Sequence, residues 1–204
     1  MPTFDLENGF PGIVAGIDEV GRGPLCGPVY AACVVLDRVR YPQRVDDSKK
    51  ISRVGRERIF NEVLELERNG LLRYGIGIVE PEEVDRINVR NATKVAMALA
   101  FLECTLKYDA RIDTVLVDGD FVPDISAHAL AIVKGDGKSY SIACASVVAK
   151  VLRDWELDFM DVKHPHYGWR KNKGYATREH LEAIERHGLV ENYHRKSFCR
   201  RFLS

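Results

Sequence analysis

The sequence lacks the features that mark membrane, secreted and disulfide-stabilised proteins. No apolar run approaches the roughly 18 residues that a membrane-spanning helix needs. The first ten residues include Asp5 and Glu7 and show no basic segment followed by an apolar one, the pattern of a secretory signal. The five cysteines are an odd number without a CxxC pair, which argues against a disulfide framework or a structural zinc site. We therefore expect a cytoplasmic protein whose reduced cysteines pack as small apolar side chains.

An excess of charge of one sign is also missing, because 30 Lys and Arg balance 30 Asp and Glu. A hydrophobic fraction of 46% and a charged fraction of 29% are typical of a globular domain and argue against intrinsic disorder. The charges are unevenly placed: residues 163–204 carry ten Lys or Arg against four Glu, a net charge of +6, which leaves −6 for residues 1–162. This asymmetry is typical of a protein that binds a polyanion, and a solvated basic tail would have the same composition.

Aromatic side chains are interleaved with this positive charge. The segment 163–175 reads KHPHYGWRKNKGY and places Tyr167, Trp169 and Tyr175 among cations. Cations bind phosphates and aromatic faces stack on sugars or bases, so the segment is a candidate nucleic-acid contact. Its glycines favour a loop. The alternative is an aromatic-rich loop that closes over the core.

Hydrophobic patterning predicts an α/β domain. Short apolar runs predict strands at residues 12–18, 29–36, 71–79, 114–117 and 129–133. Helical spacing, caps and stop signals predict helices at residues 52–69, from 80, at 92–106, at 145–159 and at 177–186. We expect the first three strands to form an antiparallel meander and the later strands to join through crossover helices. The result is one mixed sheet with helices on its faces.

Acidic residues follow three of the predicted strands. Asp18 and Glu19 close the first strand, Asp118 closes the strand at 114–117, and Asp136 follows the strand at 129–133. Adjacent strand residues point to opposite faces, so Asp18 and Glu19 share a site only if Glu19 lies in the glycine-rich turn that follows. Carboxylates gathered at one rim repel each other unless a cation binds. Mg²⁺ suits such ligands, and two ions about 3.5–4 Å apart activate a water and stabilise the leaving oxygen of a phosphodiester.

Several long blocks of the sequence match a known family in order, from residue 16 to residue 198. They read GIDEVGRGPLCGPV, DSKKIS, VLVDG, KGDGKSYSIACASVVAKVLRD, HYGWRKNKGYATREH and HRKSF. In these blocks the chain resembles the ribonuclease HII family of the bacterial type. The resemblance implies a ribonuclease H-like fold with a mixed five-stranded sheet flanked by helices, in a single catalytic domain over residues 1–204. Residues 155–204 are then a C-terminal helical extension that binds substrate.

The same resemblance implies an activity, a cofactor and a set of site residues. It implies an endoribonuclease that cuts the RNA strand of RNA–DNA hybrids and single ribonucleotides embedded in duplex DNA. The products carry 3′-hydroxyl and 5′-phosphate ends, and the cofactor is Mg²⁺ or Mn²⁺ in a two-metal site. The family's carboxylates match Asp18, Glu19, Asp118 and Asp136, and its GRG motif, whose backbone reads the 2′-hydroxyl, matches Gly21, Arg22 and Gly23. The tyrosine that stacks on the adjacent deoxyribose resembles Tyr175, and Lys49 and Ser139 resemble phosphate contacts.

These roles agree with the chemistry of the residue types. RNA differs from DNA at a site by its 2′-hydroxyl, so a reader must approach that atom closely, and glycines permit the approach. A tyrosine ring packed on a flat deoxyribose leaves no room for an extra hydroxyl. The mild departure at Cys26, where the family usually has Ala, lies away from the proposed metal site.

Two other functions are considered beside this one. A different metal-dependent DNA nuclease on the same fold, such as a junction resolvase, would share the acids and cut an all-DNA duplex equally well. A non-catalytic nucleic-acid binding module would bind with salt-dependent affinity and never cleave. We expect a monomer whose partner is an RNA–DNA hybrid or ribonucleotide-containing duplex DNA, with no contact to a membrane.

Overall fold

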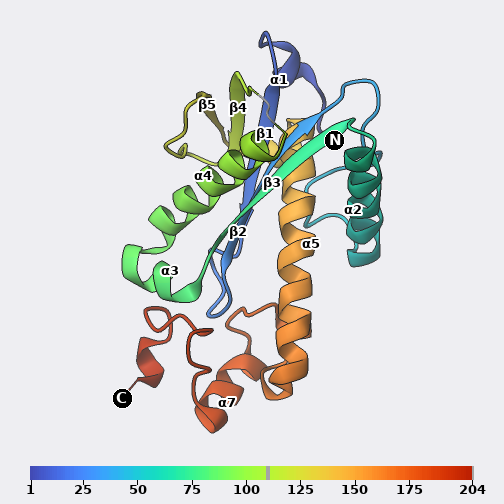
Figure 1. The fold of residues 1–204 in the computed structure, drawn as a ribbon. Coiled ribbons are helices and arrows are strands. Elements are labelled where there is room, and N and C mark those ends of the chain that lie inside the picture. Colours follow the sequence, from blue (N-terminus) through green and yellow to red (C-terminus); the bar gives the residue numbers. More distant parts are fainter. Residues whose placement is uncertain (109–110, 204) are drawn as a thin grey trace.

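The computed structural model describes residues 1–108 and 111–203 and contains a five-stranded sheet with the strand order β3-β2-β1-β4-β5 (Figure 1). The strands β1 (Val14–Val20), β2 (Val29–Leu36) and β3 (Leu72–Val79) form an antiparallel meander. The strand β4 (Thr114–Asp118) runs parallel to β1, and β5 (His128–Ile132) runs parallel to β4. The predicted mixed sheet and its early meander are confirmed.

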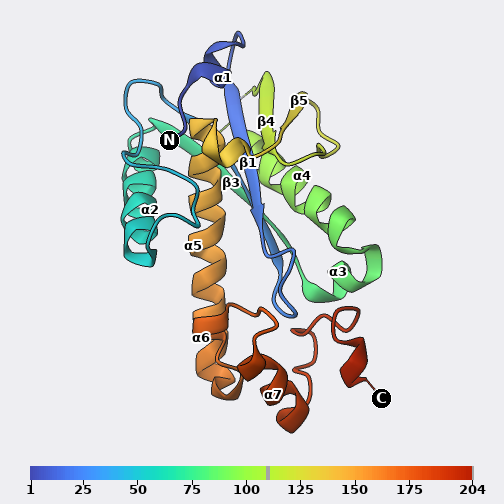
Figure 2. The same ribbon diagram turned by 180° about the vertical axis from the view of Figure 1, so that it is seen from behind.

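Helices cover both faces of the sheet (Figures 1 and 2). The helix α4 (Val89–Tyr108) packs on the face that carries Ala31 and Cys33. The helices α5 (Tyr140–Lys163) and α2 (Arg53–Arg68) cover the opposite face, which carries Ala32 and Val34. Successive strand residues alternate between the two faces of the sheet. Because β2 is apolar at positions on both faces, it packs into the core on each side.

Local sequence signals set several helix boundaries. The Ser52 hydroxyl accepts a hydrogen bond from Gly55 N–H at the start of α2, and the Thr177 hydroxyl accepts one from His180 N–H at the start of α7 (Arg178–His187). Gly188, with a φ of 76°, ends α7. Proline begins α3 (Pro81–Ile87), and a short helix α1 (Asp5–Asn8) precedes the sheet.

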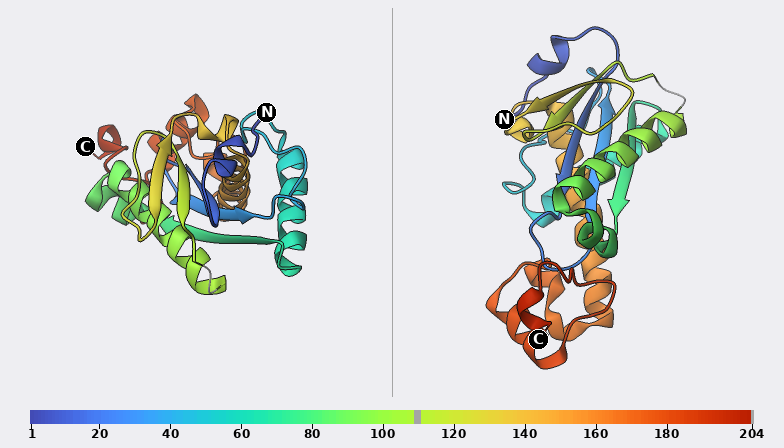
Figure 3. Two further views of the ribbon diagram at one scale, coloured as in Figure 1. Left: turned by 90° about the horizontal axis from the view of Figure 1, so that it is seen from above. Right: turned by 90° about the vertical axis from the view of Figure 1, so that its left-hand side faces the viewer.

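The C-terminal part of the chain lies beyond one end of the sheet, against the far end of α5 (Figures 2 and 3). The helix α5 runs without a break through residue 155, the predicted start of the extension. The extension continues through η2 (Pro165–Tyr167), α6 (Trp169–Asn172), α7 and η3 (Arg200–Phe202). Residue 204, the last of the predicted extension, lies outside the described residues.

Two aromatic residues of this extension form its core. Tyr167 and Trp169 are 4% and 0% exposed, and their rings stack with centroids 4.8 Å apart. The Tyr167 hydroxyl donates to Gly188 O, and the Trp169 indole N–H donates to His180 Nε2. Of the two interpretations of this segment, the aromatic-rich loop that closes over the core holds for Tyr167 and Trp169, because packing and hydrogen bonding occupy them inside the protein. Tyr175 is the exception, with 47% of its surface exposed.

The cysteines and the helices agree with two further expectations. All five cysteines are free and buried, which confirms that they pack as small apolar side chains: Cys26, Cys33, Cys104, Cys144 and Cys199. Within the described residues, every helix is too short or too polar to cross a membrane.

Candidate active site

Three carboxylates converge where β1 and β4 end. One oxygen from each of Asp18, Glu19 and Asp118 lies within 4.8 Å of the others. The two strands run parallel, so their carboxyl ends meet at the same edge of the sheet. Their pairing stops at Ile17 and Val117, and the acids follow directly where the ladder ends. The structure thus brings together three of the four acids that the sequence singled out.

Glu19 reaches the site from within a strand. It pairs with Ala31 of β2, and β1 continues to Val20, so the expectation that Glu19 lies in the following turn is wrong. Asp18 pairs with Ala32, so the two acidic side chains leave β1 on opposite faces of the sheet. Beyond Ile17, β1 has no ladder partner on its β4 side in the part of the chain that the structure describes. This open strand edge gives the longer Glu19 side chain a route to its neighbours.

Hydrogen bonds orient the three carboxylates. Asp18 Oδ1 accepts from Glu19 N–H at 2.7 Å, and Asp118 Oδ1 accepts from Gly135 N–H at 2.6 Å. The Arg22 guanidinium donates from Nη1 to Glu19 Oε1 at 3.1 Å. Each acid is thereby held at one oxygen by a donor from a neighbouring segment, which fixes the direction of the other oxygen.

Burial and mutual repulsion raise the pKa of two of these acids. Burial is the larger cause for Asp18, and the charges of Glu19 and Asp118 raise its pKa further. Burial also raises the pKa of Glu19, although the hydrogen bond and charge of Arg22 oppose that shift. A divalent cation would neutralise the charge that burial makes unfavourable. The donors are all oxygen atoms and strongly negative, which fits Mg²⁺ or Mn²⁺.

Asp136 lies at the margin of the cluster. It belongs to η1 (Gly135–Gly137), the one-turn helix that precedes α5. Burial raises the pKa of Asp136, and the charges of Asp118 and Asp47 add to the shift. The group of three acids within 4.8 Å does not include it among the described residues. Asp136 is therefore close enough to feel the charge of Asp118 without joining its immediate cluster.

Lys49 is a cation at this rim, on the side of Asp136. Its Nζ lies 3.9 Å from Asp136 Oδ2, and its side chain is 82% exposed. Partial burial acts to lower the pKa of Lys49, but the charges of Asp47, Asp136 and the other site acids outweigh burial and raise it. Lys49 is therefore charged at neutral pH and open to an anionic ligand.

Ser139, a predicted phosphate contact, lies inside the protein. Its side chain is 0% exposed. It is the N-cap of α5, where its hydroxyl accepts from Ile142 N–H at 3.2 Å. The same hydroxyl donates to Glu7 Oε1 at 2.7 Å, and Ser139 N–H donates to Gly135 O. The polar groups of Ser139 that could donate to a phosphate are already used inside the protein.

Gly21, Arg22 and Gly23 form an exposed turn beside the carboxylates. The turn links β1 to the segment that leads into β2, and Arg22 and Gly23 are exposed. Gly21 has a φ of 98°, and a side chain at that position would collide with the Arg153 guanidinium and with Pro28 O. A Cβ placed on Gly23 would lie 3.4 Å from Cε1 of Tyr175. The turn and the half-exposed Tyr175 ring are therefore adjacent parts of one surface.

Comparison with known proteins decides the family. The sequence profile of the family described as Ribonuclease HII matches residues 15–201. The chain belongs to the ribonuclease HII family. It is 43% identical over 199 residues to the ribonuclease HII of Wolbachia pipientis wMel, and the match covers 97% of this chain and 96% of that protein. The ribonuclease HII family places the chain among the type 2 ribonucleases H, which are endonucleases and phosphodiester hydrolases.

Solved structures share the ribonuclease HII fold. The ribonuclease H2 from Pyrococcus horikoshii OT3 matches with a TM-score of 0.72 and 24% identity, over 94% of this chain and 97% of that one. A structure of Bst-RNase HIII in complex with Mn²⁺ matches with a TM-score of 0.75 and 17% identity, over 90% of this chain and 66% of that one. The ribonuclease H-like fold expected from the sequence is confirmed.

One residue near the carboxylates was not anticipated. The Ser146 side chain lies beside Asp18 and opposes the rise in the pKa of that acid. It also lies 2.9 Å from the Ser48 hydroxyl, and both serines are buried. Ser146 is one of the few polar residues in a run of small apolar ones on α5, and that contrast was the available signal. It connects the segment around Lys49 to the acidic site.

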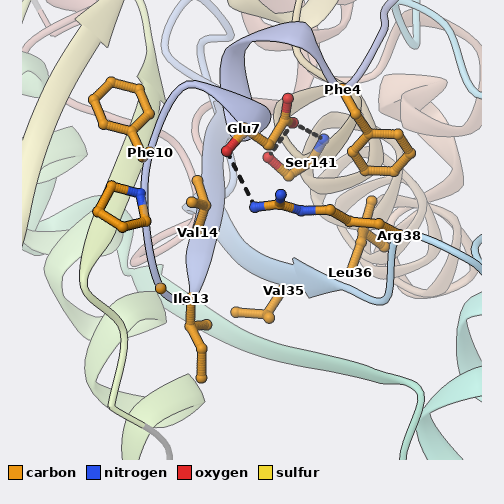
Figure 4. Close-up of a pocket in the computed structure, with 11 residues that line it drawn as sticks. Phe4, Glu7, Phe10, Ile13, Val14, Val35, Leu36, Arg38 and Ser141 are labelled. Carbon is orange, nitrogen blue, oxygen red and sulfur yellow. Dashed lines mark hydrogen bonds between the residues drawn. The ribbon is translucent and has the colours of Figure 1, made fainter.

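A pocket of this structure lies away from the acids. A cavity of about 420 Å³ is lined by the N-terminal segment and by the ends of β1 and β2, including Val14, Leu36 and Arg38 (Figure 4). Arg38 donates to Glu7 O, and Glu7 Oε1 accepts from Ser141. The pocket lies where β1 begins, whereas the acids lie where it ends. It is separate from the candidate active site.

Proposed function

We propose that this protein hydrolyses the RNA strand of RNA–DNA hybrids and cuts at single ribonucleotides embedded in duplex DNA, leaving 3′-hydroxyl and 5′-phosphate ends. The observation that carries the proposal is the placement of three converging carboxylates next to an exposed glycine turn. The acids provide a place for hard cations at a phosphodiester. The turn allows backbone groups to approach a sugar closely, which a test for ribose requires.

Asp18, Glu19 and Asp118 would hold Mg²⁺ or Mn²⁺, and Asp136 would complete a second site. When bound, a pair of such ions supplies an activated water and neutralises charge on the departing 3′-oxygen. The Mn²⁺ in the Bst-RNase HIII structure supports this choice of ion. The raised pKa values of Asp18 and Glu19 support it as well, because uncompensated charge at these positions is unfavourable.

The remaining residues act on the substrate backbone and sugars. Arg22 and Lys49 are cations at the rim, where the phosphates of a bound duplex would lie. The exposed turn of Gly21, Arg22 and Gly23 would contact the 2′-hydroxyl on one side of the cut. The Tyr175 ring, adjacent to Gly23, would pack on the deoxyribose on the other side. Together they would recognise a junction between ribose and deoxyribose.

Three duplexes of one sequence test the proposal: all DNA, DNA with a single ribonucleotide, and a full RNA–DNA hybrid. We expect cleavage of the two ribose-containing duplexes in Mg²⁺ or Mn²⁺ and none of the all-DNA duplex. Asp118→Asn is the control for the site and should lose cleavage of both by about 100-fold or more. Equal cutting of all three duplexes would favour the resolvase-like alternative. Salt-dependent binding without cleavage in either metal would favour a binding module.

A further inference from the structure

A buried guanidinium lies directly beneath the glycine turn. Arg195 is 0% exposed and donates all five of its N–H groups to carbonyl oxygens of residues 21–27. Nη2 donates to Gly21 O at 2.6 Å and to Gly27 O at 2.7 Å, and Nε donates to Gly27 O at 3.0 Å. Nη1 donates to Arg22 O at 3.2 Å and to Pro24 O at 3.1 Å. One side chain thus fixes four peptide groups of the turn.

These bonds also determine where the N–H groups of the same peptide bonds point. In a trans peptide the C=O and the following N–H point in opposite directions, and no cis bond occurs within the described residues. Gly21 O and Arg22 O point inward to Arg195, so Arg22 N–H and Gly23 N–H point outward. In residues 1–108 and 111–203, neither N–H has a hydrogen-bond acceptor. Arg195 therefore presents two adjacent free donors at the exposed surface.

The charge of Arg195 strengthens this arrangement. Burial lowers the pKa of Arg195 to about 10, with the charge of Arg153 as a further cause, so the guanidinium stays protonated at neutral pH. It has no carboxylate partner within 4.0 Å in the described part of the chain. The inward carbonyl oxygens compensate the buried charge of Arg195. In turn, this cation polarises the peptide groups, so that their outward N–H groups donate more strongly.

The residue before Arg195 is connected to the tyrosine half of the same surface. His194 Nδ1 accepts from Val190 N–H at 2.8 Å, so the proton of the neutral ring is on Nε2, which faces His180 Nε2 at 3.2 Å. His180 Nε2 also accepts from the Trp169 indole at 3.0 Å, so its proton is on Nδ1 and is donated to Tyr175 O at 2.9 Å. These tautomers follow from the partners. The chain of bonds ends at the backbone of the tyrosine.

The histidines and Cys26 also place three ligand-type atoms within 4.8 Å of one another. A metal there would need ring nitrogens that the neutral network already uses. Backbone hydrogen bonds join the same segments: Leu25 N–H donates to Gly174 O, and Arg195 N–H donates to Leu25 O. We therefore interpret Cys26, His180 and His194 as part of the packing that joins the turn to Tyr175, and not as a metal site.

We propose that His194 and Arg195 are positioning residues that set the spacing and direction of the two halves of the ribose–deoxyribose reader. The inference rests on the proposed function. Arg195 aims the donors of Arg22 and Gly23, and His194 acts through His180 on Tyr175. Because the two residues are covalent neighbours, the distance between the halves is fixed inside the extension, away from the metal-binding acids.

The first test is Arg195→Lys. Lysine keeps the charge but lacks the planar fork that spans Gly21 O and Gly27 O. We expect kcat/KM to fall by about 100-fold on both ribose-containing duplexes, the effect of a small misplacement of a reacting group. The affinity for Mn²⁺, measured by titration calorimetry, should stay at the wild-type value because the carboxylates do not touch Arg195. Tyr167→Phe, which removes one hydrogen bond in the same extension, is the matched control for general loosening and should keep wild-type kcat/KM.

The second test separates positioning from stability at the tyrosine half. His180→Asn keeps a donor near Nδ1 for Tyr175 O, whereas His180→Gln places its amide near Nε2 and loses that donor. We expect His180→Gln, which loses the bond to Tyr175 O, to lower the preference for a single ribonucleotide over a full hybrid by about tenfold. His180→Asn, which keeps that bond and loses the contact with His194 Nε2, should lower the preference by less. The ratio of kcat/KM for the two substrates stays the same when a variant is only less stable.

The outcomes separate this inference from the proposed function. A wild-type enzyme that cuts all-DNA and ribose-containing duplexes alike overturns the proposed function. A wild-type enzyme that discriminates, together with an Arg195→Lys variant within about threefold of it, overturns the inference. Equal shifts in both His180 variants overturn it as well. If Arg195→Lys does not fold, as judged by its melting curve, the His180 pair decides.

Discussion

Asp18 illustrates how a proposed metal-binding residue lowers the stability of the metal-free protein. Its pKa is raised by burial first and by the charges of Glu19 and Asp118 next. A carboxyl with a higher pKa in the folded than in the unfolded chain binds its proton more tightly when folded. The free energy of unfolding therefore falls as pH rises from the unfolded pKa through the folded one. Above both pKa values the metal-free protein bears this destabilisation in full.

Neutralising Asp18 should therefore stabilise the metal-free protein and disable the enzyme. Asp18→Asn keeps an oxygen that accepts from Glu19 N–H and removes the charge. We expect Tm to rise by about 2–4 °C, the change that about 1 kcal/mol produces in a chain of this length, and cleavage to fall by about 100-fold or more. Melting curves with and without Mg²⁺ and cleavage of the single-ribonucleotide duplex measure both effects. Asp124→Asn, at an exposed acid, should change neither, and a lower metal-free Tm for Asp18→Asn would contradict the argument.

At the scale of elements, the extension around α7 depends on uncharged histidines. Burial lowers the pKa of His194 from 6.5 to about 4, and the neighbouring His180 and His164 add to the shift. Burial also lowers the pKa of His180. A histidine with a lower pKa in the folded chain binds its proton less tightly there, so the stability is complete above pH 6.5. It is lost as pH falls from about 6.5 toward about 4.

Acidification in this window should loosen the extension before the sheet. Trp169 reports the event because its indole N–H donates to His180 Nε2. In a Trp155→Phe background Trp169 is the only tryptophan, since the chain has two, and we expect its emission to shift to the red as pH falls. His194→Gln should move or remove the transition, and His128→Gln, at an exposed histidine of β5, should leave it in place. An identical transition in the His194 variant would show that another group controls it.

The elements also show how far the sequence determines the fold. Periodicity and caps predicted β2 at its observed bounds and α2 and α7 within a residue or two, because these signals are local. Glu19 was misplaced because the end of the β1–β4 ladder depends on a strand far away in the chain. The burial of Ser139 depends on Glu7, and that of Tyr167 and Trp169 on a core that the extension shares with Leu25 and Cys26, so local sequence could not predict either. The acids were found from the sequence because they lie at or near the ends of apolar strands, whereas the proposed role of Arg195 depends on tertiary contacts with the turn.

At the scale of the whole molecule, the positive and negative charges that are unevenly placed in the sequence are also separated in space. The extension carries the net positive charge of residues 163–204 and lies beyond one end of the sheet (Figure 3). Tyr175 within it adjoins the turn beside the acids. A duplex seated on this surface would meet the cations of the extension while its scissile bond meets the carboxylates. Attraction to the extension therefore offsets the repulsion between phosphates and the acidic body.

This arrangement predicts that substrate affinity depends on salt mainly through the extension. Lys171 is exposed on α6, and the Asn172 carbonyl next to it accepts from Tyr175 N–H, which places Lys171 near the proposed sugar contact. Each phosphate contact contributes about 0.9 to the slope of log affinity against log salt. In the Asp118→Asn background, used to prevent cleavage, Lys171→Gln should lower that slope by about this amount. Arg40→Gln, which removes an exposed cation outside the extension, should leave it unchanged. Equal slopes for the two variants would mean that the extension does not hold the duplex backbone, and substrate contacts would have to be sought on the acidic body.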